Sequence, residues 1–135
     1  MPSHEPVGQK RILIVDDEPA LLKMMSIYLQ RRGFSVKTCD TTGEAAALSQ
    51  AHPDAFEVAV LDATMPGLSV DELALQMLAR SGAVRVLVDS GYLIDMSILE
   101  AAAPGRVAFL HKPFTPEMLA LAVERMIAPE KEKEV

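Results

Sequence analysis

The sequence predicts an α/β fold in which five strand–helix units form one parallel sheet with helices on both of its faces. Three observations support this prediction. Short apolar runs alternate along the chain with segments whose apolar residues recur at helical spacing. Turn and cap residues separate these segments, and the connections are short, which favours parallel strands joined by right-handed crossovers. For five strands we expect the doubly wound order 2-1-3-4-5.

The first strand is expected at Arg11–Val15, and a helix follows it. Pro19 suits the first position of that helix, where its missing N–H is no loss. Gly33 favours the left-handed conformation that ends a helix. Between these two positions lies an apolar stripe at helical spacing, formed by Leu21, Leu22, Met25 and Leu29.

The second strand is expected at Phe34–Cys39, followed by a helix over Gly43–Ala51. Thr41 and Glu44 have the spacing of a capping box at the start of this helix. The third strand is expected at Phe56–Leu61, in which Val58–Leu61 is an unbroken apolar run. Such a run is typical of a central strand that is buried on both faces of a parallel sheet.

The third helix is expected to begin at Val70 and to be capped by Gly82. Val84–Val88 is expected to form the fourth strand. A short helix with weak apolar patterning is expected over Ile94–Ala102, and Pro-Gly follows it closely.

The fifth strand is expected at Arg106–Leu110, and the last helix begins soon after it. Thr115 suits the N-cap of that helix, and Pro116 suits its first position. The expected domain division is a disordered leader at 1–9, one flavodoxin-like domain at 10–127, and a charged tail or linker at 128–135.

Composition narrows the class of protein. The chain has 135 residues and a formal net charge of −6, and it shows no basic stripe, which argues against direct nucleic-acid binding. Cys39 is the single cysteine, so we expect a small buried hydrophobe rather than a disulfide or a zinc ligand. The chain shows neither a signal-peptide core nor the roughly 20 apolar residues that span a bilayer. We therefore expect a cytoplasmic protein without membrane insertion.

Three acids and one lysine lie where expected strands end. Asp16 and Asp17 follow the first strand, Asp62 follows the third, and Lys112 follows the fifth. Because the carboxyl ends of parallel strands meet at one edge of a sheet, we expect these side chains to share a cleft. Any one acid could be a solvated loop residue, but the combination favours a site for Mg²⁺ and a phosphoryl group.

Each of these residue types has a chemical use in such a site. Asp62 can attack phosphorus as a nucleophile and form an acyl phosphate. Lys112 precedes Pro113, which holds it extended, so its ammonium can reach Asp62 and a phosphoryl oxygen. The bond between Lys112 and Pro113 could be cis or trans. Ser90 offers a hydroxyl to the same cleft, and Gly91 keeps the approach open.

Four segments, in this order and spacing, resemble the receiver domain of two-component response regulators over about residues 10–127. The segments are Val15-Asp16-Asp17-Glu18, Leu61-Asp62-Ala63-Thr64-Met65-Pro66-Gly67, Ser90-Gly91-Tyr92 and Phe109-Leu110-His111-Lys112-Pro113-Phe114. The resemblance implies a signalling switch rather than an enzyme with an external substrate. Such a domain catalyses only its own phosphorylation and dephosphorylation.

The resemblance also implies a role for each site residue. Asp62 would accept the phosphoryl group from the phosphohistidine of a histidine kinase or a histidine phosphotransfer domain. Asp17, Asp62 and the backbone carbonyl of Thr64 would bind Mg²⁺, with Asp16 assisting through water. Lys112 would pair with the phosphoryl group.

Switching would follow from the same resemblance. Ser90 would move to hydrogen-bond the phosphoryl group, and Phe109 would swing inward as a coupled aromatic switch. The residues that would flank the pocket are Thr64, Met65, Gly91, Tyr92 and Pro113. The fourth helix, fifth strand and fifth helix would form the readout surface. That surface would contact a downstream protein or a fused domain, or a second copy in a homodimer.

The chain departs from the family pattern at three places. Asp89 stands where the family usually has an apolar strand residue, so it is either exposed by an early strand end or adds negative charge near the site. Val70 replaces a frequent glycine. The segment Ser90–Pro104 is rich in alanine, which predicts a mobile or offset fourth helix.

Other functions stay open. A constitutive scaffold domain could keep the fold without the switch. A magnesium phosphohydrolase could act on a small molecule, although such enzymes commonly carry a second Asp at the position of Thr64. Ser90 does not lie in a Gly-x-Ser-x-Gly elbow, which disfavours a serine hydrolase.

Overall fold

The computed structural model describes residues 9–127, in which five strands alternate with five helices. The strands are β1 (Arg11–Val15), β2 (Ser35–Cys39), β3 (Val58–Asp62), β4 (Arg85–Ser90) and β5 (Val107–His111). The helices are α1 (Pro19–Arg31), α2 (Thr42–Ala51), α3 (Val70–Arg80), α4 (Ser97–Ala102) and α5 (Pro116–Ile127). Nearly all of the predicted leader and the whole predicted tail lie outside the described residues.

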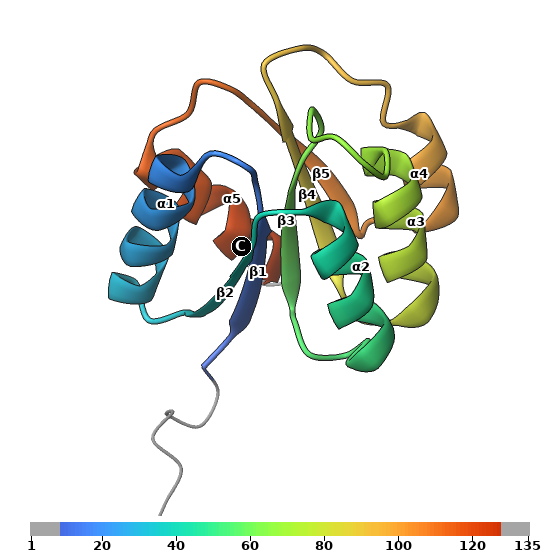
Figure 1. Ribbon diagram of the computed structural model, residues 1–135, viewed down its shortest axis with the longest axis horizontal. Coiled ribbons are helices and arrows are strands. Elements are labelled where there is room, and N and C mark those ends of the chain that lie inside the picture. The colour runs from blue at the N-terminus through green and yellow to red at the C-terminus, as the bar shows by residue number, and fades with distance from the viewer. Residues whose placement is uncertain (1–8, 128–135) are drawn as a thin grey trace, which may run out of the picture.

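All strand pairs are parallel, and the sheet has the order β2-β1-β3-β4-β5, which confirms the predicted doubly wound topology. Helices α1 and α5 cover one face of the sheet, while α2, α3 and α4 cover the other (Figure 1). The strands all run towards the same edge, so every loop that follows a strand lies there. This edge is where ligands bind in open sheets of this kind.

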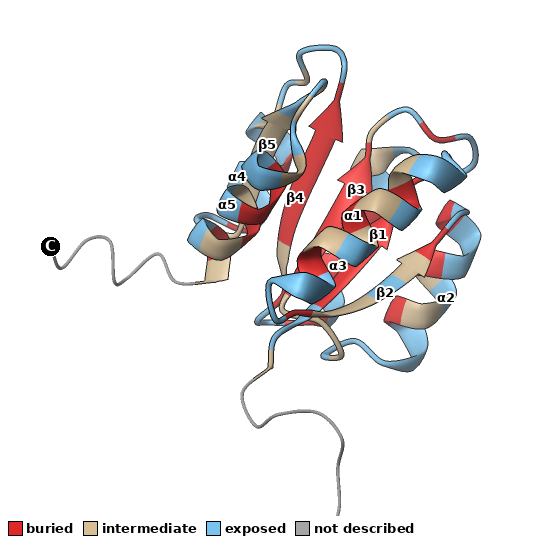
Figure 2. Ribbon diagram, turned by 90° about the vertical axis from the view of Figure 1, so that its left-hand side faces the viewer, coloured by how far each residue is buried: buried red, intermediate tan, exposed pale blue. Residues whose placement is uncertain are grey.

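The core consists of two apolar layers, one on each face of the sheet, because successive side chains of a strand point to opposite faces. Ile14, Val60 and Leu87 pack towards α1 and α5, whereas Val15 and Leu61 pack towards α2, α3 and α4. Every residue of β3 is buried (Figure 2), as the unbroken apolar run predicted. Full burial of one such side chain stabilises the fold by about 1.5–3 kcal/mol, so these layers stabilise the sheet that carries the edge.

The observed helix caps agree with the prediction at α1 and α2 and differ from it at α3. Gly33 has a φ of 97° just beyond α1, as predicted. The Thr41 hydroxyl accepts the N–H of Glu44 and caps α2. The full capping box, however, lies before α3, between Ser69 and Glu72, and was not predicted. The cap predicted at Gly82 was wrong, because α3 ends at Arg80 and its C-cap is an extended Ser81.

The bounds of β3, β4 and α4 differ most from the predicted ones, and β3 begins at Val58 rather than at Phe56. β4 continues two residues past the predicted Val88, because it pairs with β5 through Asp89 and because the Lys112 N–H donates to the Ser90 carbonyl. α4 begins only at Ser97, so the predicted first turn from Ile94 is not helical. The longer β4 places Asp89 inside the sheet.

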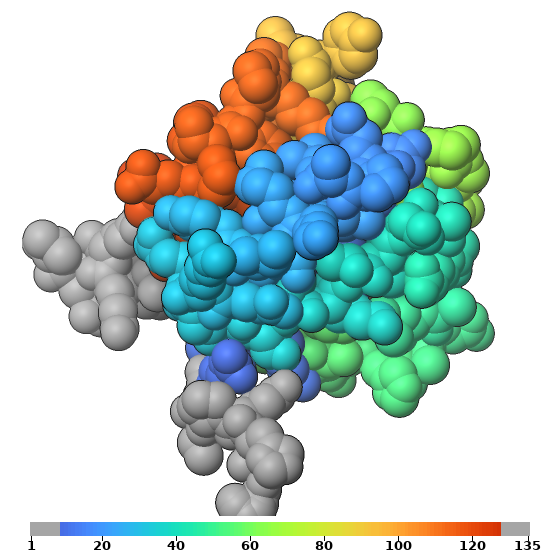
Figure 3. Space-filling model, turned by 60° about the vertical axis from the view of Figure 1, so that its left-hand side comes forward, coloured from blue at the N-terminus to red at the C-terminus, as the bar shows by residue number. Residues whose placement is uncertain are grey.

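The surface around this edge is formed by α1, the loops and α5. In the space-filling view α1 lies between the orange α5 and the teal α2, and the gold loop between β4 and α4 projects at the top (Figure 3). Two apolar side chains of this loop are solvent-exposed, Tyr92 at 74% and Leu93 at 87%. No helix within residues 9–127 combines the length and apolar character needed to cross a membrane.

Candidate functional site

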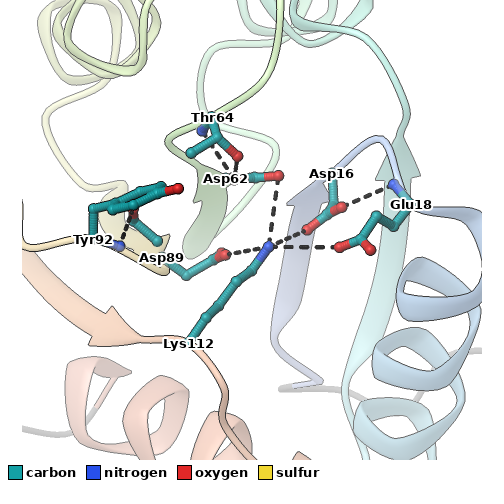
Figure 4. Close-up of polar contacts among 8 residues, drawn as sticks. Asp16, Glu18, Asp62, Thr64, Asp89, Tyr92 and Lys112 are labelled. Atoms are coloured by element: carbon teal, nitrogen blue, oxygen red, sulfur yellow. Dashed lines mark hydrogen bonds and ion pairs between the residues drawn. The ribbon is translucent and has the colours of Figure 1, made fainter.

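Four charged side chains lie together at the carboxyl edge of the sheet, one from each of four adjacent strands (Figure 4). They are Asp16 after β1, Asp62 in β3, Asp89 in β4 and Lys112 after β5. Each lies two residues beyond an apolar residue of the layer under α1 and α5, namely Ile14, Val60, Leu87 and Leu110. Because alternate residues share a face, all four project to the same side.

Lys112 is at the centre of this group. Its Nζ lies 3.4 Å from Asp16 Oδ2, 3.6 Å from Asp62 Oδ2 and 3.4 Å from Asp89 Oδ1. Glu18 Oε1 is farther away, at 3.8 Å. The aspartate side chains are at most 3% exposed and the lysine side chain is 20% exposed. These ion pairs are therefore poorly screened by water, unlike exposed surface pairs.

The surroundings shift the pKa of three of these groups. Burial raises the pKa of Asp89 to about 7, although the nearby Lys112 ammonium opposes the shift. Burial also raises the pKa of Asp16, with partial relief from the Glu18 N–H and from Lys112. Burial alone would lower the pKa of Lys112, but the three carboxylates outweigh it and raise the pKa. The site thus concentrates negative charge around a cation that stays protonated.

The carboxylate of Asp62 is held in a fixed orientation. Its Oδ1 accepts the backbone N–H of Thr64 at 3.0 Å and the Thr64 hydroxyl at 2.9 Å. Its Oδ2 points towards Lys112. Asp16 is fixed in a similar way, since its Oδ1 accepts the Glu18 N–H at 2.9 Å while its Oδ2 approaches Lys112. Both carboxylates therefore present one oxygen to the centre of the cleft.

Asp16, Asp17 and Asp62 form a group that suits a divalent cation. Each offers one carboxylate oxygen, and these oxygens all lie within 4.8 Å of one another. Asp16 and Asp62 are buried, whereas Asp17 is exposed at the mouth of the cleft. A hard cation that keeps several waters is bound by such a set of oxygens, so the donor atoms fit Mg²⁺.

Ser90 is adjacent to this group but differs in its contacts. Its side chain is fully buried, and its Oγ accepts the backbone N–H of Tyr92 at 3.0 Å. Gly91 and Pro113 line a hollow of about 400 Å³ beside Lys112, together with Leu21 and Phe114. The bond between Lys112 and Pro113, left open by the sequence, is cis.

Two other predicted residues, Phe109 and Met65, belong to the apolar layer under α2, α3 and α4. Phe109 is partly buried against the layer under α2, α3 and α4, and its ring centroid is 6.2 Å from that of His111. Met65 is buried in the same layer. Two contacts of Lys112 were not predicted, those with Asp89 and with Glu18. The position of Asp89, two residues after Leu87, was the available signal for the first of these.

Comparison with known proteins shows the family to which this chain belongs. The model of the response regulator receiver domain matches residues 12–124. The transcriptional activator protein PfeR of Pseudomonas aeruginosa is 32% identical over 114 residues, which are 84% of this chain and 36% of that protein. FixJ of Bradyrhizobium diazoefficiens is 32% identical over 117 residues, which are 86% of this chain and 56% of that protein. The chain thus spans about one third of PfeR and a little more than half of FixJ.

Solved structures show the same similarity. A CheY-like response regulator receiver domain protein from Methanospirillum hungatei has a TM-score of 0.76 and 27% identity, covering 95% of this chain and all of that one. The receiver domain of the hybrid histidine kinase CckA has a TM-score of 0.74 and 26% identity, covering 87% of this chain and 98% of that one. The predicted resemblance is therefore confirmed for the fold and for the family match.

Proposed function

Since this chain belongs to the response regulator receiver domain family, we propose that Asp62 accepts a phosphoryl group from a phosphohistidine. The donor would be a histidine kinase or a histidine phosphotransfer domain. The single observation that carries this proposal is the environment of Asp62. Its carboxylate is oriented by Thr64 on one side and faces the ammonium of Lys112 on the other, 3.6 Å away.

The proposed transfer is a substitution at phosphorus. A carboxylate oxygen of Asp62 forms a new O–P bond, and the P–N bond of the phosphohistidine breaks. The electron pair stays on the imidazole nitrogen, and a proton on the other ring nitrogen lets the ring leave as neutral imidazole. Water can later attack the same phosphorus, which returns the free carboxylate and releases inorganic phosphate.

The acidic group would hold a cation during this reaction. Asp16, Asp17 and Asp62 are the residues that would bind Mg²⁺, directly or through water, with the backbone carbonyl of Thr64. When bound, the ion would offset the charge on the transferring phosphoryl oxygens. Lys112 supplies the second positive charge at the same place, and it is held there by carboxylates on three sides.

Phosphorylation would then act as a switch, because it adds about −1.5 to −2 charge and new acceptor oxygens at one point. Ser90 would exchange its Tyr92 N–H contact for the phosphoryl group, and Phe109 would move inward. The readout surface would be α4, β5 and α5. Exposed apolar side chains on the two helices, Ile98, Met118 and Leu121, support this choice. A downstream protein or a fused domain would bind there.

Phosphorylation by acetyl phosphate with Mg²⁺, followed by intact mass, tests the proposal. We expect one phosphoryl adduct on the wild type, no adduct on Asp62→Asn, and loss of the adduct when a chelator replaces Mg²⁺. Asp54→Asn is the matched control, because Asp54 is an exposed acid between α2 and β3, away from the cleft. It should be modified as the wild type is.

The opposite result would favour a different function. A folded wild type that takes up no phosphoryl group and does not respond to beryllofluoride would contradict the proposal. It would favour the constitutive interaction domain, with the fold kept and the switch lost. Uptake that persists in Asp62→Asn would instead place the acceptor on another residue.

A further inference from the structure

Asp89 is a charged residue that the proposed transfer does not use. It lies inside β4 as the register partner of Asp62 in β3 and is only 1% exposed. A carboxylate is costly to bury unless it is paired and hydrogen-bonded. Among residues 9–127, Asp89 Oδ1 accepts no hydrogen bond, and its ion pair at 3.4 Å is with Lys112.

Lys112 is therefore shared. Asp89 relies on it for a compensating charge, while Asp62 faces it from the other side at 3.6 Å. The Coulombic attraction of Asp89 is the largest single cause that raises the pKa of Lys112. Any new anion on Asp62 must draw on the same ammonium and must also approach the negative charge of Asp89 on the adjacent strand.

We propose that Asp89 is a positioning residue that competes with the phosphoryl group for Lys112 and so shifts the switch towards its unphosphorylated state. This inference rests on the proposed function. Two effects act in the same direction. Asp89 holds the lysine in its present position, and it repels the charge of about −1.5 to −2 that phosphorylation adds. Contacts that differ between the unphosphorylated and the phosphorylated state set the populations of these two states.

The competition predicts a gain of affinity when the charge is removed. Binding of beryllofluoride in the presence of Mg²⁺, followed by NMR at about pH 8, measures this affinity. We expect Asp89→Asn to bind beryllofluoride about tenfold more tightly than the wild type. Asp89→Val should behave in the same way, since a β-branched residue suits a buried strand. Asp54→Asn removes one charge elsewhere and should leave the affinity unchanged.

A second measurement tests the ion pair between Asp89 and Lys112 without any phosphoryl mimic. Lys112→Met is introduced into the wild type and into Asp89→Asn, and the urea midpoint of unfolding is compared in magnesium-free buffer. We expect Lys112→Met to lower the midpoint clearly in the wild type and by at most half as much in Asp89→Asn. Such a double-mutant cycle isolates the coupling between the two side chains.

The outcomes separate this inference from the proposed function. Wild type that binds no beryllofluoride overturns the proposed function, and the competition fails with it. If the wild type binds beryllofluoride as tightly as both Asp89 variants do, only the proposed competition is overturned. Equal effects of Lys112→Met in the two backgrounds overturn it as well. A purely structural role for Asp89 predicts weaker binding in its variants, the opposite of the gain expected here.

Discussion

Asp62 and Asp89 are register partners on adjacent parallel strands, and both carboxylates approach the same ammonium, that of Lys112. This arrangement follows from strand geometry, because partners in a parallel pair that share a face lie side by side. One cation thus faces two carboxylates with different proposed roles. Asp62 receives the phosphoryl group, and Asp89 holds the lysine.

Magnesium should stabilise the folded protein through Asp17. At about ten times its Kd, the ion is expected to add about 1.4 kcal/mol to the free energy of unfolding of the wild type. Asp17→Asn should lose most of this gain without losing stability in magnesium-free buffer, since Asp17 is exposed. Urea denaturation with and without Mg²⁺ measures both effects. Asp40→Asn, an exposed acid just after β2, is the control and should keep the full gain.

The pH dependence of stability should reveal Asp89. Its pKa rises from 3.8 to about 7 on folding, mainly through burial. Between these values the folded state holds a proton that the unfolded state has released, so the free energy of unfolding falls as pH rises. Asp89→Asn lacks this group. Its stability relative to the wild type should therefore increase from about pH 4 to about pH 7 in magnesium-free buffer.

Denaturant midpoints at several pH values check this sign. Titrating groups far from the cleft are present in both proteins and cancel in the difference. Parallel pH profiles for the wild type and Asp89→Asn would contradict the expected shift of the Asp89 pKa.

The loop after Asp62 should be sensitive to a single methyl group. Gly67 has a φ of 95°, and a Cβ added there would overlap the hydroxyl of Thr42. That hydroxyl donates to the Pro66 carbonyl and accepts the Leu68 N–H, so it holds the loop against α2. We expect Gly67→Ala to lower the free energy of unfolding by about 2 kcal/mol.

Gly82→Ala is the matched control for this loop. Gly82 does not have a positive φ, and no atom lies within 4 Å of an added Cβ. The free energy of unfolding of Gly82→Ala should stay within about 0.5 kcal/mol of that of the wild type. Equal urea midpoints for the two alanine variants would show that the Thr42 contact does not restrict the loop.

Cys39 should be chemically inert in the folded protein. The thiol is 1% exposed, and burial, followed by the charge of Glu44, raises its pKa to about 11. Because the thiolate is the reactive form, alkylation by iodoacetamide should be slow at neutral pH and rapid in denaturant. Mass spectrometry over time measures both rates. Rapid labelling under native conditions would contradict the burial of this side chain.

Much of the fold and site could be predicted from local patterns. The apolar runs, Pro19 and Gly33 gave the strand and helix positions, and the acids at the strand ends indicated the cleft. Signals were misassigned where they were weak. Gly82 was expected to cap α3, but Ser81 is already extended, and the capping box at Ser69 and Glu72 was not identified. Local propensity gives the existence of an element more reliably than its last residue.

The alternation of strands and helices, the parallel sheet, and the acids and lysine at its carboxyl edge all follow from the sequence pattern. Only the tertiary structure decided that β4 continues to Ser90 and that Asp89 is buried against Lys112. The end of a strand depends on the backbone hydrogen bonds of its neighbours, here those of β5. A carboxylate beyond the last apolar residue can be solvated or buried, and pairing with the adjacent strand decides which.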